Sequence, residues 1–105
     1  MFVAMEKLRP THDLDAIKAA IGSPETLAIT RTALSDALSL GFSRAAIAAA
    51  IQGIRRPMFY KSMTTLRDHR TWQDVYHVPA DGQVLYVKFQ ADVVTEFRVM
   101  SFKER

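Results

Sequence analysis

The spacing of the apolar residues changes once along this chain, close to Met58, and this change limits the possible folds more than any other feature. Before Met58, apolar residues recur three and four positions apart, as in amphipathic helices. After it, they tend to alternate with polar residues, and β-branched and aromatic side chains dominate, as in strands. Helices followed by strands with short links predict an α+β fold, with N-terminal helices packed on a C-terminal antiparallel β-sheet.

Three helices are predicted in the first half of the chain. The expected N-terminal caps are a side chain within residues 11–13, Thr30 and Ser43, and the expected C-terminal stops are Gly22, Gly41 and Gly53. The residues expected on the buried faces are Leu14, Ile17 and Ile21 in the first helix, Ala33, Leu34, Ala37 and Leu38 in the second, and Ile47, Ala50, Ile51 and Ile54 in the third.

Four strands are predicted in the second half, near residues 58–64, 72–78, 83–91 and 93–103. Residues 80–82 are expected to join the middle pair, and Ala91 and Asp92 the last pair. In the third strand, Tyr86 and Lys88 alternate with apolar residues and should share a polar face. In the last strand, Phe102 falls out of phase with Phe97 and Val99, so we expect a bulge or burial on both faces.

Length and charge set broader limits. A chain of 105 residues has room for one small core, so residues 1–105 are expected to form a single domain. It contains no cysteine and no recognisable signal peptide, which fits a soluble protein of the reducing cytoplasm. Lysine and arginine balance the acidic residues before residue 53, so the net charge of +3 belongs to the second half. A polyanion is expected to bind there, although so small an excess can also serve solubility alone.

Residues 59–76 interleave cations, amides, hydroxyls and aromatic rings on a strand pattern, a mixture that suits RNA better than a core. RNA supplies its own nucleophile, the ribose 2′-hydroxyl, so side chains that move protons and stabilise a phosphorane can cut it without a metal. The candidates for this chemistry are Lys61, Tyr60, Tyr86, Lys88 and Lys103 on strands, Gln73 as a phosphate or sugar ligand, and Arg67 and Arg70 on the connection between the first two strands.

Each candidate also has a purely structural explanation. A strand lysine such as Lys61 is usually a solvated charge that discourages edge pairing. Tyr60 is more often a packing residue with a hydrated tip than a surface on which bases stack. Gln73 is harder to explain in this way, because Gln and its neighbour Asp74 are poor strand formers. Asp74 and His77 are expected to hold no metal, since their odd separation on a strand points them to opposite faces.

Several literal runs match a known family pattern. The longest are Phe-Tyr-Lys-Ser-Met-Thr-Thr at residues 59–65, Trp-Gln-Asp-Val-Tyr at residues 72–76, Gly-Gln-Val at residues 82–84 and Ser-Phe-Lys-Glu at residues 101–104. Shorter matches are Met-Glu-Lys at residues 5–7 and Thr-Arg-Thr-Ala-Leu at residues 30–34. Through these runs, nearly the whole chain resembles the MqsR family, the ribonuclease toxins of bacterial toxin–antitoxin pairs.

This resemblance implies a RelE-like ribonuclease fold and a ribosome-independent, sequence-selective mRNA endoribonuclease without cofactors, cutting at a GCU-like triplet. It also implies an antitoxin partner similar to MqsA, a zinc-binding protein with a helix-turn-helix DNA-binding part. The catalytic residues that it carries over are Lys61, Gln73, Tyr86 and Lys103. The residues expected to bind RNA beside them are Tyr60, Arg67, Arg70 and Lys88.

Chemistry and resemblance together give a hypothesis for the roles. Lys61 and Lys103 stabilise the phosphorane and one of them acts as acid or base, Tyr86 moves a proton or stacks a base, and Gln73 orients the RNA. For Lys61 to be the base, neighbouring cations such as Lys103 must depress its pKa. Residues 1–4 precede the family pattern and are expected to be dispensable. Two other classes stay open: a non-catalytic nucleic-acid-binding module, and an interaction domain of a toxin–antitoxin repressor complex.

Overall fold

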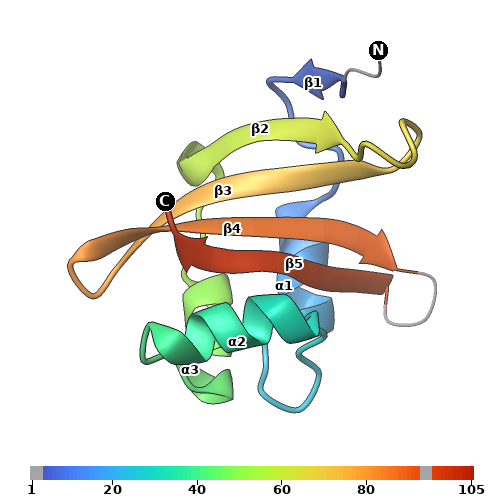
Figure 1. Ribbon diagram of the computed structural model, residues 1–105. Helices are drawn as coiled ribbons and strands as arrows, with labels where there is room; N and C mark the ends of the chain where they lie inside the picture. Colours follow the sequence, from blue (N-terminus) through green and yellow to red (C-terminus); the bar gives the residue numbers. More distant parts are fainter. Residues whose placement is uncertain (1–3, 93–95) are drawn as a thin grey trace.

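The computed structural model describes residues 4–92 and 96–105 and confirms the α+β fold (Figure 1). Most of the predicted extension, residues 1–4, lies outside the described residues. The helices are α1 (Leu14–Ile21), α2 (Arg31–Ser39) and α3 (Arg44–Gln52), and a 3-10 turn, η1 (Arg56–Met58), follows them. The strands are β1 (Glu6–Lys7), β2 (Phe59–Thr64), β3 (Trp72–Ala80), β4 (Gln83–Asp92) and β5 (Glu96–Glu104).

The helices begin and end where their capping residues predict. The side chains of Asp13, Thr30 and Ser43 each accept a backbone N–H from two or three residues further on, at 3.1 to 3.2 Å. Such a cap typically stabilises a helix by about 1 kcal/mol. Gly41 follows α2 with a φ of +89°, a conformation that glycine adopts without strain.

Among the described residues no single helix is long and apolar enough to span a membrane, and α2 and α3 meet that requirement only together, as a pair bent by 96°.

The strands form one antiparallel sheet in the order β1-β2-β3-β4-β5, one strand more than the four predicted. The two residues of β1 are too few to show a period in the sequence. Asp81 and Gly82, at φ of +51° and +78°, make the tight turn between β3 and β4. Ala91 and Asp92 were expected in the next turn, but they pair with β5 as the end of β4. That connection and the predicted start of β5 at residue 93 lie outside the described residues.

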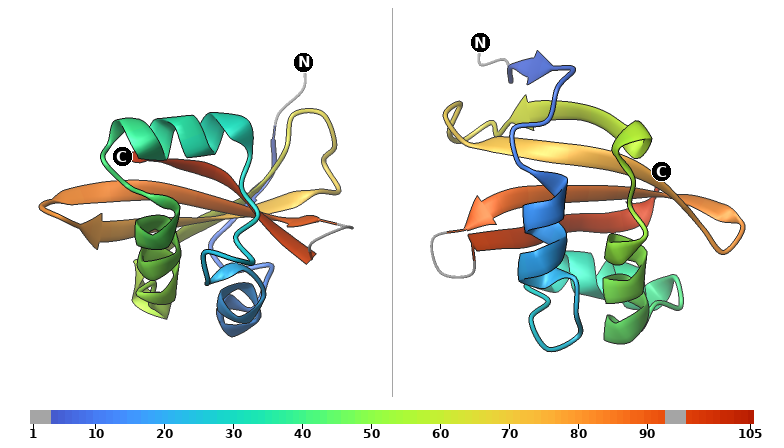
Figure 2. Two further views of the ribbon diagram at one scale, coloured as in Figure 1. Left: turned by 90° about the horizontal axis from the view of Figure 1, so that it is seen from below. Right: turned by 180° about the vertical axis from the view of Figure 1, so that it is seen from behind.

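Helices α1 and α3 cover one face of the sheet, while α2 runs beside β5 (Figure 2). The core between these layers includes the fully buried residues Ile17, Ile21, Ile47, Ile51, Leu85, Val87, Phe89 and Phe102. Leu38 was expected in this core but is 54% exposed. At the edge of the sheet α2 buries only a narrow stripe, which Ala33 and Ala37 occupy. Ile54 is buried as expected, although α3 ends before it.

Asp74 is a fully buried carboxylate in β3, on the helix side of the sheet. Its oxygens accept the backbone N–H groups of Thr11 at 3.0 Å and His12 at 2.8 Å. Ser62 of β2 shares a 2.7 Å hydrogen bond with the Thr11 hydroxyl. Asp74 therefore fastens the segment between β1 and α1 to the sheet, which explains an acidic residue in a central strand.

Candidate active site on the open sheet face

The alternation of side chains along β4 identifies the residues on the sheet face opposite α1 and α3. Leu85, Val87 and Phe89 are fully buried in the helix-side core, so the residues between them point the other way. Tyr86 and Lys88 therefore lie on the face that Figure 1 turns toward the viewer, called here the open face. Their shared face agrees with the sequence prediction.

The pairing of β4 with β3 and β5 shows which residues of those two strands also lie on the open face. His77 of β3 lies directly opposite Tyr86, and Tyr86 lies directly opposite Lys103 of β5. Further along, Gln73 of β3 lies opposite Gln90 of β4. Directly opposed residues of antiparallel strands share a face. The predicted residues Gln73, Tyr86 and Lys103 are thus gathered on the open face.

A β-bulge in β2 brings two consecutive residues to this face. Phe59 pairs with Tyr76 on the core side, and the register shifts before Lys61, so Tyr60 is the extra residue. The ring of Tyr60 stacks on His77, with centroids 4.2 Å apart and planes 22° apart. The Lys61 Nζ lies 5.4 Å from the centroid of the Tyr60 ring. Bulges re-aim side chains in this way beside functional sites.

A second bulge lies in β5 at Met100. Phe89 pairs with Val99 and the register then shifts, which leaves Met100 as the extra residue. The shift returns Phe102 to the core beside Val99, so of the two alternatives predicted for this strand the bulge is correct and Phe102 does not lie on the opposite face. One position later, Lys103 emerges on the open face, with its Nζ 5.5 Å from the Tyr86 ring centroid.

Lys61 is held in place by Glu6 of β1. Its Nζ lies 2.5 Å from the Glu6 Oε2, and the Lys61 side chain is only 20% exposed. The hydrogen bond to Glu6 raises the pKa of Lys61 above its ordinary value. The condition for Lys61 to be the base, a pKa depressed by neighbouring cations such as Lys103, is therefore not met, because the hydrogen bond to Glu6 is the largest influence on that pKa. The contact with Glu6 thus favours the charged form of Lys61.

Three other ionisable groups of the open face are perturbed. Burial, reinforced by the nearby charge of Lys103, lowers the pKa of Lys88. Burial raises the pKa of Tyr86, so its hydroxyl keeps its proton at neutral pH. Burial, reinforced by the charge of Arg105, lowers the pKa of His77, so its imidazole is neutral there. The open face thus combines a proton acceptor, a proton donor and cations within a small area.

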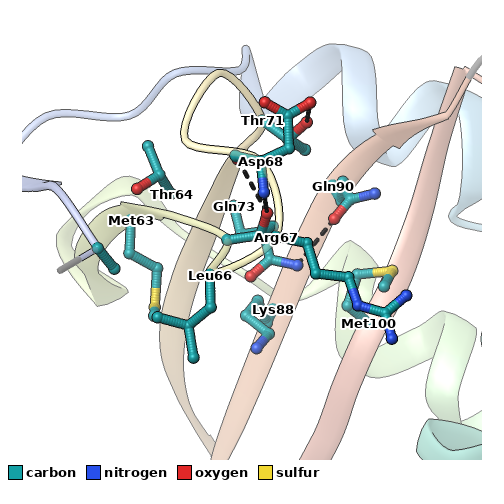
Figure 3. A pocket seen from close by; sticks show the side chains of 12 residues that line it. Met63, Thr64, Leu66, Arg67, Asp68, Thr71, Gln73, Lys88, Gln90 and Met100 are labelled. Carbon is teal, nitrogen blue, oxygen red and sulfur yellow. Dashed lines mark hydrogen bonds between the residues drawn. The ribbon is translucent and has the colours of Figure 1, made fainter. Parts of the chain in front are cut away.

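A hollow of about 720 Å³ lies at one end of the open face, beside the connection between β2 and β3 (Figure 3). Gln73 and Gln90 line it and are joined by a hydrogen bond, in which the Gln73 Nε2 donates to the Gln90 Oε1 at 2.8 Å. Lys88 lines it from β4, and Arg67 reaches into it from the connection. Gln73 is therefore an oriented amide at a site with two cations, rather than a packing residue of the core.

Asp68 organises the connection between β2 and β3. Its carboxylate accepts hydrogen bonds from the Arg70 N–H at 2.9 Å and the Thr71 hydroxyl at 3.1 Å, and its own N–H donates to the Thr65 hydroxyl at 2.9 Å. The bond from the Arg70 backbone is the main reason that the pKa of Asp68 is lowered. The Arg70 guanidinium also pairs with Asp68, at 3.3 Å, whereas Arg67 lines the hollow.

The predicted residues fall into two adjacent groups. The first group consists of Tyr60, Tyr86, Lys61 and Lys103. It lies around the aromatic row, which we define as Tyr60, His77 and Tyr86. The second surrounds the hollow and consists of Gln73, Lys88 and Arg67. Arg70 belongs to neither group.

Sequence reasoning missed two residues of the open face. Glu6 was missed because it comes from an unpredicted strand. His77 was considered for acid–base chemistry and as a metal ligand with Asp74 but was not selected as a site residue, and the structure confirms that the Asp74 and His77 side chains point to opposite faces. The signal that could have found His77 is its even separation from Gln73, which places both residues on one face of β3.

The fold and the site define a class of protein: a small α+β protein whose open sheet face suits a polyanion such as RNA. The family model described as "Motility quorum-sensing regulator, toxin of MqsA" matches residues 9–104. The mRNA interferase toxin MqsR of Escherichia coli (strain K12) is 36% identical over 101 residues, which cover 96% of this chain and 100% of that protein. The chain belongs to the MqsR toxin family.

Proposed function

We propose that this chain is the toxin of a type II toxin–antitoxin pair, a ribosome-independent endoribonuclease that cuts mRNA at selected sequences. The observation that carries the proposal is the gathering of Lys61, Gln73, Tyr86 and Lys103 on one open face. The Escherichia coli relative is named an mRNA interferase toxin, which agrees with the chemistry of that face. Since mRNA is its substrate, we place its action in the cytoplasm.

The proposed reaction uses the 2′-hydroxyl of the substrate as nucleophile and needs no metal. The ammonium groups of Lys61 and Lys103 stabilise the charge that develops on the phosphorane, and Tyr86 supplies a proton. Removing one such electrostatic partner commonly slows an enzyme by about a hundredfold or more. The raised pKa of Lys61 supports the role of a permanent cation.

Gln73 and the hollow beside it are proposed to hold the RNA around the scissile phosphate. The Gln73 amide, fixed by Gln90, can bond a phosphate or sugar oxygen, while Lys88 and Arg67 neutralise neighbouring phosphates. Tyr60, which is 46% exposed on the aromatic row, offers a ring on which a base can stack. Arg70 contributes charge from the periphery.

The proposed partner is an antitoxin similar to MqsA, with a zinc-binding part and a helix-turn-helix DNA-binding part. The family description supports the pairing, since it names the family as the toxin of MqsA. An antitoxin would bind this chain and prevent RNA cleavage.

The test is cleavage of a defined mRNA by the purified, antitoxin-free protein, without ribosomes and with EDTA present. We expect discrete new 5′ ends with the wild type, and at least about a hundredfold slower cutting with Lys61→Ala or Lys103→Ala, both checked for folding by circular dichroism. Intact RNA that nonetheless binds the protein in a salt-dependent manner would favour the non-catalytic binding module instead. Lys61→Ala cutting at the wild-type rate would overturn the assignment of this residue.

A further inference from the structure

His77 occupies the centre of the aromatic row. It comes from β3, lies directly opposite Tyr86, and stacks on Tyr60 with ring centroids 4.2 Å apart. Its ring centroid lies 6.2 Å from that of Tyr86, with an angle of 43° between the planes. Lys103 continues the same line of opposed residues on β5. The imidazole is thus fixed between two tyrosines at the point where the cations converge.

The described residues leave both ring nitrogens of His77 available to a substrate. Within residues 4–92 and 96–105, neither nitrogen has a hydrogen-bond partner, whereas the Nε2 of His12 lies 3.4 Å from the Trp72 carbonyl oxygen. The ring is half-buried, so it is positioned by packing without being sealed from the solvent. A general base needs such an accessible lone pair within reach of the proton that it takes.

The groups around His77 favour a neutral imidazole beside an anionic substrate. Tyr60 and Lys61 approach from β2, Tyr86 from β4, Lys103 from β5, Arg105 from the C-terminus, and Glu6 pairs with Lys61 from β1. Cations therefore outnumber the one carboxylate. Burial and the charge of Arg105 lower the pKa of His77, while Glu6 raises that of Lys61, so the lysine is the poorer base at neutral pH.

We propose that His77 is a catalytic residue of this chain, the general base that removes the proton of the ribose 2′-hydroxyl. This inference rests on the proposed ribonuclease function and names the base that the function requires.

The proton and the bonds balance without any further reactant. An imidazole nitrogen of His77 takes the 2′-hydroxyl proton, and the 2′-oxygen forms a bond to phosphorus. The bond between phosphorus and the 5′-oxygen breaks, and the Tyr86 hydroxyl donates its proton to that oxygen. The products are a 2′,3′-cyclic phosphate and a 5′-hydroxyl. Proton transfer from His77 to Tyr86 through water then restores both groups.

Two substitutions separate this role from stacking alone. His77→Phe keeps an aromatic ring on Tyr60 but removes both lone pairs, and Tyr86→Phe removes the proposed proton donor. The substrates are a single-stranded RNA oligonucleotide that carries a wild-type cleavage site, and the same oligonucleotide with sulfur replacing the 5′-oxygen at the scissile phosphate. A thiolate leaves without needing a proton, so the second substrate no longer requires the acid.

We expect His77→Phe to cut both substrates about a hundredfold more slowly than the wild type, because loss of a general base is not relieved by a better leaving group. Tyr86→Phe should be slow on the oxygen substrate and recover on the sulfur substrate. RNA affinity of His77→Phe should stay close to that of the wild type. His77→Gln is a second variant without the imidazole, in case His77→Phe misfolds. Circular dichroism and thermal unfolding that match those of the wild type show that a variant is folded.

The pH profile gives an independent reading. With the sulfur substrate, the wild-type rate should rise with pH and level off above the pKa of His77, which burial and the charge of Arg105 hold below the ordinary histidine value. His77→Phe should lose this limb. If His77→Phe keeps the wild-type rate and limb, or loses only RNA affinity, the role as base is wrong while the ribonuclease function stands. A wild type that cuts neither substrate would overturn both.

Discussion

Glu6 lies 2.5 Å from Lys61, carboxylate oxygen to ammonium nitrogen, across the pairing of β1 with β2. This contact fixes one of the two proposed phosphate-stabilising lysines and also places an anion at the edge of the site. The proposed RNA site therefore includes a carboxylate that competes with phosphate for the same ammonium group.

Removing that anion should strengthen RNA binding. We expect Glu6→Gln to bind a non-cleavable single-stranded RNA about two- to fivefold more tightly at low salt, the range of an exposed ion pair. Fluorescence anisotropy measures this change, and Glu25→Gln, in the connection between α1 and α2, is the matched control. Weaker binding by Glu6→Gln would mean that positioning Lys61 outweighs the repulsion of the phosphate.

The two arginines of the connection between β2 and β3 should differ. Arg67 lines the hollow, whereas Arg70 is paired with Asp68. Arg67→Ala should lower RNA affinity and reduce the slope of log affinity against log salt by about 0.7, the value for one phosphate contact to a single strand. Arg70→Ala should change both quantities less. Equal effects of the two substitutions would show that only overall charge matters here.

Asp74 should contribute to stability rather than to RNA chemistry. Asp74→Ala leaves the N–H groups of Thr11 and His12 without their acceptor, which is expected to cost about 2 kcal/mol of unfolding free energy. Urea denaturation followed by circular dichroism measures the loss. Asp36→Ala on α2 is the control and should stay within about 0.5 kcal/mol of the wild type. A wild-type midpoint for Asp74→Ala would contradict the anchoring role.

Tyr76 should make stability fall in alkaline solution. Burial raises its pKa from 10.0 to about 12 in the folded state, so unfolding releases a proton between these values. Its contribution is complete below pH 10 and declines as the pH rises to about 12, by about 2 to 3 kcal/mol in total. Tyr76→Phe should therefore lose less stability than the wild type between pH 9 and pH 11.5. Tyr60→Phe, on an exposed ring, should follow the wild type.

Local sequence signals predicted most of the fold because they act over a few residues. Thr30 and Ser43 cap helices wherever their oxygens meet a free N–H, and the alternation of β4 puts Tyr86 and Lys88 on one face whatever the rest of the chain does. The local pattern does not show where a helix or strand lies relative to the sheet and the other helices. Leu38 continues the apolar stripe of α2, yet it is exposed because α2 runs along the edge of the sheet.

The site was harder to predict, since it depends on contacts between distant segments. Glu6 and Lys61 are separated by 55 positions and meet only through the short strand β1. The bulge at Tyr60 leaves no signature in the sequence, although it is the reason that Tyr60 and Lys61 share a face with His77. Only the bulge at Met100 could be foreseen, because Phe102 breaks the alternation of β5.

The most direct test of the proposed reaction is a single 2′-deoxy substitution at the nucleotide whose 2′-hydroxyl adjoins the scissile phosphate. The wild-type protein is incubated with this oligonucleotide and with its all-ribose counterpart, in EDTA and without ribosomes. We expect the all-ribose RNA to be cut to a 2′,3′-cyclic phosphate and a 5′-hydroxyl end, and the substituted one to remain intact at that position. Equal cleavage of both would contradict the use of the substrate 2′-hydroxyl by the open face.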